Sequence, residues 1–127
     1  MSKYRTPLKN ARGLGSAKSG TEHFVHQRLT ATALVALTIW FLVFVLSLIG
    51  ADYVTATAAV SKPWNAVLLS AFVVAMFWHA KLGLQVVIED YVHTPGLAIA
   101  SQLAVVFVCV LAALASVLAI IRIALGA

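Results

Sequence analysis

Three long runs of residues without a charged side chain constrain most strongly how this chain can fold. The runs are 23, 18 and 31 residues long and occupy residues 29–51, 63–80 and 91–121. A helix needs roughly 20 apolar residues to cross a hydrocarbon layer about 30 Å thick, so each run, with its flanks, can supply one crossing. The sequence therefore predicts three membrane-spanning helices.

The composition supports the same fold class. Of the 127 residues, 62% are hydrophobic and 10% are charged, whereas soluble domains carry roughly 25% charged residues. A chain this small cannot bury so much apolar surface, because even a domain of about 150 residues leaves roughly 30% of its unfolded surface exposed. The runs are continuous and rich in Ala, Leu, Val and Ile, unlike the short alternating segments of a β-barrel. An ordinary water-soluble domain is therefore excluded, and an all-α integral membrane protein is favoured.

Proline and glycine predict where the helices begin and end. Pro63 suits the first turn of the second helix, and Thr94, Pro95 and Gly96 separate the second helix from the third. We expect a single membrane-anchor domain over residues 1–127. Its expected parts are a cytoplasmic N-terminal segment and three transmembrane helices, over residues 1–28, 29–50, 63–89 and 97–124.

The basic residues predict how the helices are oriented. Six of the nine Lys and Arg residues precede the first apolar run, and cytoplasmic segments of membrane proteins carry an excess of Lys and Arg. The N-terminus is therefore expected in the cytoplasm, with the loop at residues 89–95 on the same side and the C-terminus outside. The net charge of +5 follows this topology, so we expect contact with membrane lipid and no nucleic acid as a partner.

A histidine inside the second predicted helix is the main candidate for function. At about 100° per residue, one stripe of that helix carries His79, Gly83, Val86 and Asp90. An ionisable side chain within a bilayer is costly and usually functional, and neutral imidazole is a good axial ligand for haem iron. Gly83 would remove side-chain bulk where a macrocycle lies against the helix. Two alternatives stay open: His79 hydrogen-bonds to a neighbouring helix, and Gly83 is a helix-packing contact.

Two segments of the sequence resemble one known family. Residues 79–91 (His-Ala-Lys-Leu-Gly-Leu-Gln-Val-Val-Ile-Glu-Asp-Tyr) resemble the signature of the hydrophobic membrane anchor of succinate dehydrogenase, respiratory complex II. Residues 12–18 (Arg-Gly-Leu-Gly-Ser-Ala-Lys), with His23, Phe24 and residues 27–31, are similar to the entry segment of the same anchor in its α-proteobacterial or mitochondrial-like form. The resemblance covers about the whole chain. It implies a multi-pass protein of the bacterial inner membrane, or of the mitochondrial inner membrane if the source is eukaryotic.

The resemblance also implies roles for individual residues. His79 would be an axial ligand of haem b, with the opposite ligand supplied by a companion anchor subunit, because the first and third predicted helices contain no histidine. Tyr91 would hydrogen-bond a carbonyl oxygen of ubiquinone, and Asp90 would order that site. Arg28 would hold a haem propionate, since a guanidinium can bind a carboxylate through two hydrogen bonds. His23 is expected as a surface or propionate-contacting group, because it lies outside the apolar runs.

The implied activity belongs to a complex of which this chain is one part. In a succinate:ubiquinone oxidoreductase of the tricarboxylic acid cycle and aerobic electron transport, the flavoprotein subunit with FAD oxidises succinate and the iron–sulfur subunit passes the electrons on. Ubiquinone would accept them near Tyr91, and Ser16 would lie in a docking segment for the iron–sulfur subunit. This chain has no dinucleotide-binding glycine pattern and only one cysteine, Cys109, so we expect a non-catalytic anchor subunit. The companion anchor subunit is expected to complete a helical bundle with it.

Each assignment has a simpler alternative. Arg28 could be only a positive-inside anchor, Tyr91 an interfacial aromatic residue, and Asp90 with Glu89 an ordinary solvated helix end. For the whole chain, a small helical transporter or proton-conducting subunit would use His79 and Asp90 as relay groups. A structural anchor without any cofactor contact is a second alternative.

Overall fold

The computed structural model describes residues 20–126, and almost all of them are α-helical. The helices are α2 (Gly20–Ser47), α3 (Tyr53–Val60), α4 (Pro63–Tyr91) and α5 (Pro95–Leu125). Three of them, α2, α4 and α5, are long and apolar enough to cross a membrane, and residues 20–126 contain no strand. The predicted all-α integral membrane protein with three transmembrane helices is confirmed.

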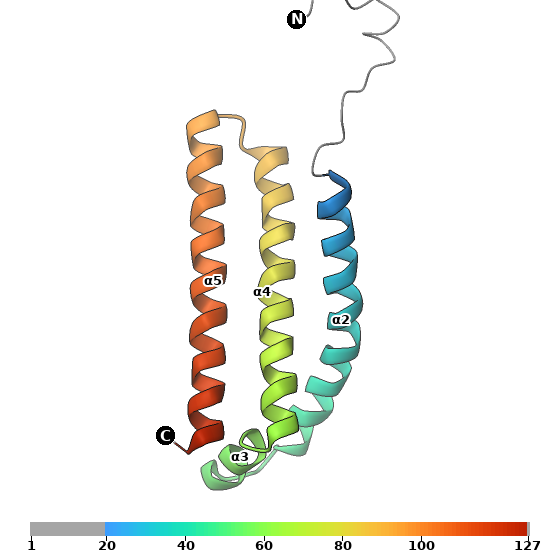
Figure 1. Cartoon of the computed structure of the whole chain (residues 1–127), viewed down its shortest axis with the longest axis vertical. Helices are drawn as coiled ribbons and strands as arrows, with labels where there is room; N and C mark the ends of the chain where they lie inside the picture. The colour runs from blue at the N-terminus through green and yellow to red at the C-terminus, as the bar shows by residue number, and fades with distance from the viewer. Residues whose placement is uncertain (1–19, 127) are drawn as a thin grey trace, which may run out of the picture.

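The three long helices lie side by side, with α4 in the middle (Figure 1). Within residues 20–126, α4 contacts both α2 and α5, while α2 and α5 do not contact each other. The start of α2, the end of α4 and the start of α5 lie at one end of the molecule, and α3 and the C-terminus lie at the other. The helices therefore alternate in direction and form a layer about one helix thick.

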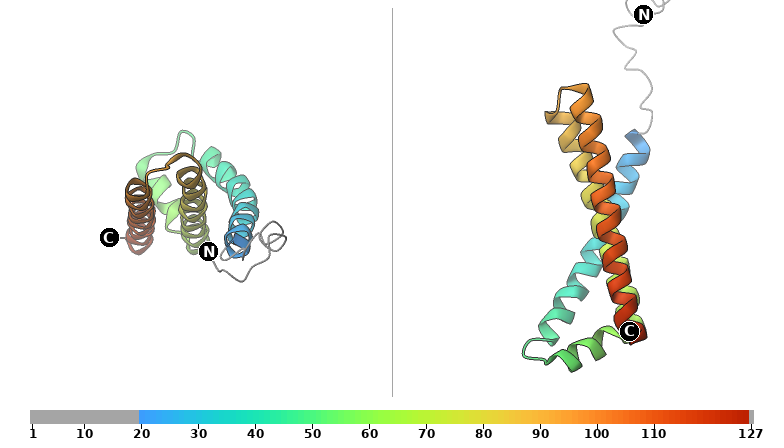
Figure 2. Two further views of the ribbon diagram at one scale, coloured as in Figure 1. Left: turned by 90° about the horizontal axis from the view of Figure 1, so that it is seen from above. Right: turned by 90° about the vertical axis from the view of Figure 1, so that its left-hand side faces the viewer.

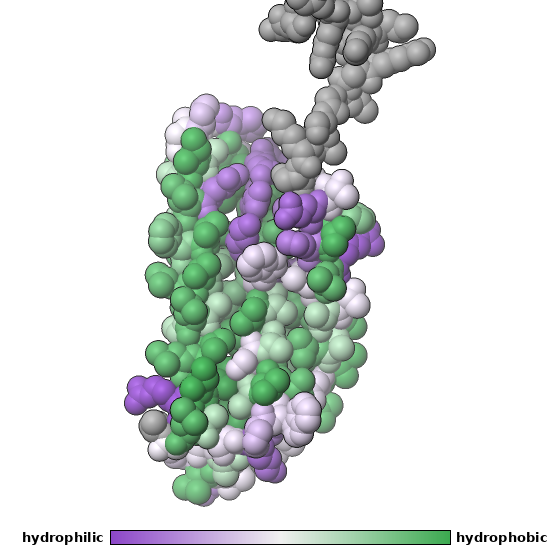
Figure 3. Space-filling model, viewed as in Figure 1, coloured by the Kyte–Doolittle hydropathy of each residue, from purple (hydrophilic) through white to green (hydrophobic). Residues whose placement is uncertain are grey.

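The helix α2 is inclined to the other two long helices. In Figure 2 it crosses the α4–α5 pair near mid-length, so that its two ends diverge from α4 on opposite sides, and α3 bridges the gap at the far end. Few side chains are buried in this arrangement; the buried hydrophobic ones among the described residues are Leu69, Leu82, Ile88 and Cys109. Figure 3 shows apolar side chains over most of the visible surface and hydrophilic ones mainly near the two ends.

The second transmembrane helix begins at Pro63, as predicted, with Lys62 as its N-cap. The third begins at Pro95 with Thr94 as its N-cap, two residues before the predicted start at residue 97, so Pro95 and Gly96 belong to the helix and not to the break. Proline is favoured in a first helical turn because its missing N–H would have no intrahelical partner there.

The start of the first helix differs from the prediction. The helix begins at Gly20 rather than near residue 29, because helix formation does not require an apolar environment and Glu22 in the first turn interacts favourably with the helix dipole. The predicted segment 1–28 is therefore helical over its last part. The motif at residues 12–18 and the docking role expected for Ser16 lie outside the described residues.

The short helix α3 was not predicted. The chain leaves α2 through Gly50, whose φ of +79° lies in the left-handed region that favours glycine. Asp52 then caps α3, its carboxylate accepting a hydrogen bond of 2.9 Å from the backbone N–H of Thr55. The hydrogen bond from the Thr55 side chain lowers the pKa of the Asp52 carboxyl most, and the hydrogen bond from the Thr55 backbone N–H lowers it further. A local cap thus starts a helix that is too short to show a clear periodic pattern in the sequence.

We predict that Asp52→Ala increases amide hydrogen exchange in the first turn of α3, because the Thr55 N–H loses its acceptor. Asp52→Asn is the control, since it keeps an oxygen at the cap. A lowered folded-state pKa contributes stability above the ordinary carboxyl pKa, and this contribution is lost as the pH falls through the lowered value. The native chain, but not Asp52→Asn, should therefore lose protection at acidic pH. Hydrogen–deuterium exchange, corrected for intrinsic rates, measures the protection of the amides in the first turn of α3. Equal protection of these amides in Asp52→Ala and in the native chain would contradict the prediction.

Candidate functional site

His79 lies near the middle of α4 and contacts α2. Its Nδ1 is 3.0 Å from the Oγ1 of Thr30, and both side chains are partly buried. The same hydroxyl donates to the backbone carbonyls of His26 at 2.8 Å and Gln27 at 3.1 Å. The open alternative of a hydrogen bond to a neighbouring helix is thus observed, and it uses only one nitrogen of the ring. Within residues 20–126, the Nε2 of His79 has no hydrogen-bond partner.

Gly83 lies one turn after His79 and leaves open space beside the helix. A Cβ atom built at Gly83 would meet no heavy atom of the neighbouring elements within 4 Å. The absence of a side chain is therefore not required by packing within the described part of the chain. The free space beside Gly83 is therefore available to a group that does not belong to the described part of the chain.

A polar groove lies between the diverging ends of α2 and α4. It has a volume of about 490 Å³. Its lining residues come from the start of α2 and the second half of α4: Gly20, Glu22, His23, His26, Trp78, Lys81, Leu82, Gln85, Val86 and Glu89. Hydrophilic side chains gather at this end of the molecule in Figure 3. The groove combines polar walls with an open side.

The polar groups of this region are only partly satisfied by the chain itself. Gln85 donates to the Glu89 carboxylate at 2.9 Å, and the His26 ring packs 6.1 Å from the Trp78 ring. In contrast, the Nε2 of His23 and the Oε1 of Gln27 are buried without a hydrogen-bond partner among the described residues. Because a buried unpaired polar atom costs about 1–3 kcal/mol, these two atoms fit a site that is completed by another group.

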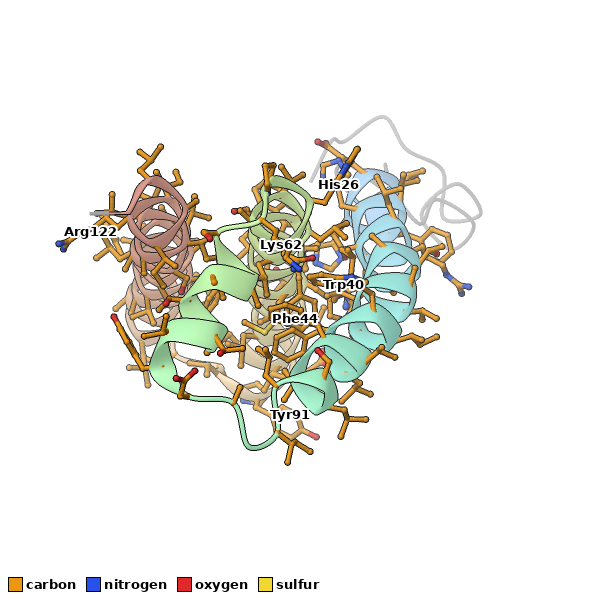
Figure 4. All side chains as sticks on the ribbon, turned by 90° about the horizontal axis from the view of Figure 1, so that it is seen from below. His26, Trp40, Phe44, Lys62, Tyr91 and Arg122 are labelled. Atoms are coloured by element: carbon orange, nitrogen blue, oxygen red, sulfur yellow. The ribbon has the colours of Figure 1, made fainter. Side chains whose placement is uncertain are left out.

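Asp90 and Tyr91 lie in the last turn of α4, and both are exposed. Asp90 returns to the stripe of His79 about 16 Å along the helix, while Tyr91 is turned by about 120° from it. Figure 4 shows Tyr91 and His26 projecting from opposite faces of the helix layer. The described chain therefore does not bring the predicted quinone-binding tyrosine into the groove that contains His23.

Arg28 also lies apart from His79. Its guanidinium stands over the Phe24 ring, 4.7 Å from the centroid, and its side chain is exposed. Arg28 precedes Thr30 by two residues, which places it about 200° around α2, on the side away from α4. Its predicted contact with a haem propionate remains a prediction.

No metal site is built by the described chain alone. Across residues 20–126, no three His, Cys, Asp or Glu side chains gather closely enough to hold a metal ion. A single imidazole with a free nitrogen, next to open space, is instead suited to contribute one ligand to a metal held by several groups.

Comparison with known proteins identifies the family. The family of succinate dehydrogenase/fumarate reductase transmembrane subunits matches residues 2–113. The chain belongs to this family. A succinate dehydrogenase hydrophobic membrane anchor subunit from Paracoccus denitrificans is 34% identical over 125 residues, covering 98% of this chain and 96% of that protein. A protein of the same name from Rickettsia bellii is 39% identical over 89 residues, covering 70% of this chain and 71% of its own length.

These matches confirm the resemblance inferred from the sequence. No solved structure gives a significant match. With its three apolar helices, this family member is a multi-pass protein of the bacterial inner membrane and one component of a larger complex. The roles of its individual residues stay predictions.

The open space beside Gly83 leads to a stability prediction. Gly83→Ala should stabilise the chain by about 0.8–1.0 kcal/mol, because alanine is the better helix former and its methyl group meets nothing. Gly50→Ala is the matched control: its surroundings are equally open, but its positive φ makes alanine cost about 1–2 kcal/mol. Thermal unfolding of the purified chain in detergent micelles, followed by circular dichroism, compares the stability of the Gly83→Ala and Gly50→Ala variants with that of the native chain. Similar destabilisation by both variants would mean that Gly83 is packed.

Proposed function

We propose that this chain is the hydrophobic membrane anchor of a succinate:ubiquinone oxidoreductase, and that it forms one side of a haem b site and part of the ubiquinone-reduction site. The complex would link the tricarboxylic acid cycle to aerobic electron transport. The observation that carries the proposal is His79, an imidazole within an apolar helix, held through Nδ1 and without a partner at Nε2 among residues 20–126. The names of the relatives from Paracoccus and Rickettsia support the same assignment.

The residues around His79 fit a haem. His79 would hold it through Nε2, and the open space at Gly83 leaves room beside the helix. His23 and Gln27 offer buried polar atoms that lack partners among the described residues. Bound haem b would supply a centre that can accept and release single electrons. Because this chain would supply one imidazole from His79, a second ligand would come from the companion anchor subunit.

The end of α4 fits the headgroup of ubiquinone. Tyr91 is 77% exposed and Asp90 is exposed beside it, so another molecule can reach both side chains. The Tyr91 hydroxyl would donate a hydrogen bond to a quinone carbonyl oxygen, and the Asp90 carboxylate would help to move protons from the adjacent aqueous phase. This end of α4 would face the cytoplasm, where the iron–sulfur subunit would deliver electrons from the flavoprotein with FAD. The chain itself would bind and orient without oxidising succinate.

A proton-conducting subunit is not favoured by the geometry of α4. His79 and Asp90 share a stripe, but Gly83 and Val86 lie between them, and neither side chain can carry a proton. His79 and Asp90 are about 16 Å apart along the helix, so this stripe provides no proton relay within α4.

Replacing His79 tests the haem assignment. His79→Leu should remove the low-spin signal of the haem from the optical and electron paramagnetic resonance spectra of the assembled complex, because an axial ligand is lost. His93→Leu is the matched control, since it removes an imidazole that lies outside the helices and should leave the spectra unchanged. If the His79→Leu complex kept the native spectrum and midpoint potential, the assignment would be wrong.

Replacing Tyr91 tests the quinone site. Tyr91→Phe should slow ubiquinone reduction by about 2- to 13-fold, because the loss of one hydrogen bond costs about 0.5–1.5 kcal/mol. Succinate oxidation with an artificial dye as acceptor should persist. Tyr53→Phe, at an exposed tyrosine at the opposite end of the molecule, provides the control. Native rates with ubiquinone in the Tyr91→Phe complex would exclude the predicted role.

A further inference from the structure

We propose that Thr30 is the positioning residue for the haem ligand: its hydroxyl oxygen accepts a hydrogen bond from the Nδ1–H of His79 and thereby keeps Nε2 unprotonated and oriented to bind iron. The geometry that leads to this assignment is the set of three contacts made by one oxygen atom. The proposal rests on the proposed function, because it requires that His79 binds haem.

The contacts of Thr30 favour one tautomer of His79. The Oγ1 atom lies 2.8 Å from the His26 carbonyl oxygen, 3.1 Å from the Gln27 carbonyl oxygen and 3.0 Å from the His79 Nδ1. A hydroxyl has one hydrogen, and a carbonyl oxygen can only accept. Nδ1 can donate or accept according to its tautomer. The shorter contact, 2.8 Å to the His26 carbonyl, favours donation of the Thr30 hydrogen to the backbone, and the hydrogen of the third contact then comes from Nδ1. In a neutral imidazole, Nε2 then carries the free lone pair that a metal requires.

The backbone of α2 holds the acceptor in place. Threonine is branched at Cβ and stiff at χ1, and its bonds to carbonyls three and four residues earlier select a particular rotamer. The lone pairs of Oγ1 therefore point in a direction set by the helix and cannot follow the ring. Because the contact joins α2 to α4, the orientation of the imidazole depends on how the two helices cross.

This arrangement has a consequence for the chemistry of the bound iron. A hydrogen bond accepted from Nδ1–H raises the basicity of the ligating nitrogen, and its loss typically reduces metal affinity about 10–100-fold. A more basic ligand donates more electron density and favours the oxidised form of the iron. Thr30 is therefore expected to lower the midpoint potential of the haem while it strengthens haem binding.

Thr32 supplies a matched control two residues away. Its hydroxyl bonds a backbone carbonyl in the same manner, donating to the carbonyl oxygen of Arg28 at 2.9 Å, but the side chain is exposed and has no contact with His79. A substitution at Thr32 therefore removes the same kind of hydrogen bond to the backbone of α2 but leaves the contact between Thr30 and His79 intact.

The experiment compares three variants of the assembled complex: Thr30→Val, Thr30→Ser and Thr32→Val. Thr30→Val keeps the shape and removes the hydroxyl, so haem affinity should fall about 10–100-fold, the midpoint potential should rise, and the low-spin resonance signal should shift. Thr30→Ser should restore the native values, and Thr32→Val should retain them. The haem-to-flavin ratio, a redox titration and electron paramagnetic resonance provide the readouts. Native values in Thr30→Val, or equal changes in Thr32→Val, would overturn the proposal.

A second measurement requires no substitution. In the reduced, diamagnetic native complex labelled with ¹⁵N-histidine, solid-state nuclear magnetic resonance should detect a protonated Nδ1 in the ligating histidine from this chain, and an unprotonated Nδ1 would refute the assignment even if Thr30→Val did not assemble. The His79→Leu complex separates the two proposals. If His79→Leu alters the haem spectrum and Thr30→Val does not, only the role of Thr30 is wrong. If the native haem does not depend on His79, both proposals are wrong.

Discussion

The crossing of α2 over α4 is the contact on which the rest of the structure depends. Inside a bilayer, helices gain little from the hydrophobic effect, because lipid chains are as apolar as their side chains. The crossing is instead held by a hydrogen bond, Thr30 to His79, and by the stacked rings of Phe41 and Phe72, whose centroids are 4.6 Å apart. Polar contacts of this kind average about 0.6 kcal/mol between membrane helices. The hydrogen bond is therefore more important for geometry than for stability.

The parts of the fold that sequence analysis predicted are those encoded by local signals. Charge-free runs define the spans, and Pro63 marks a helix start because proline suits a first turn. Pro95 was predicted to lie in the break before the third helix, but it occupies the first turn of that helix for the same reason. The short helix α3 depends on one carboxylate at Asp52, which composition does not reveal. The role of Thr30 depends on its position opposite His79, which is known only once the helices are docked. A polar stripe on α2, formed by His23, His26, Gln27 and Thr30 at helical spacing, was a signal that could have found it.

The described chain provides an incomplete site. His79 uses one ring nitrogen, the Nε2 of His23 has no partner within residues 20–126, and the space at Gly83 is empty of neighbouring side chains. Arg28 lies on the side of α2 that faces away from α4, and Tyr91 is turned away from His79 around α4. The predicted site residues therefore do not converge within the layer of helices. Sequence reasoning selected His79 by its residue type and its position inside an apolar run, but the directions in which the helices present Arg28 and Tyr91 depend on how the helices are docked.

A layer one helix thick cannot enclose a ligand (Figure 2). Any group held by His79 would be covered by this chain on one side only, and its other side would have to be covered by a second protein. Under the proposed function, cofactor binding and pairing with a companion anchor would then be thermodynamically coupled, because each would strengthen the other. Under the proposed function, a cell that made this chain in excess would accumulate a protein whose polar groove had no partner, so this chain and its companion anchor would have to be made in balance.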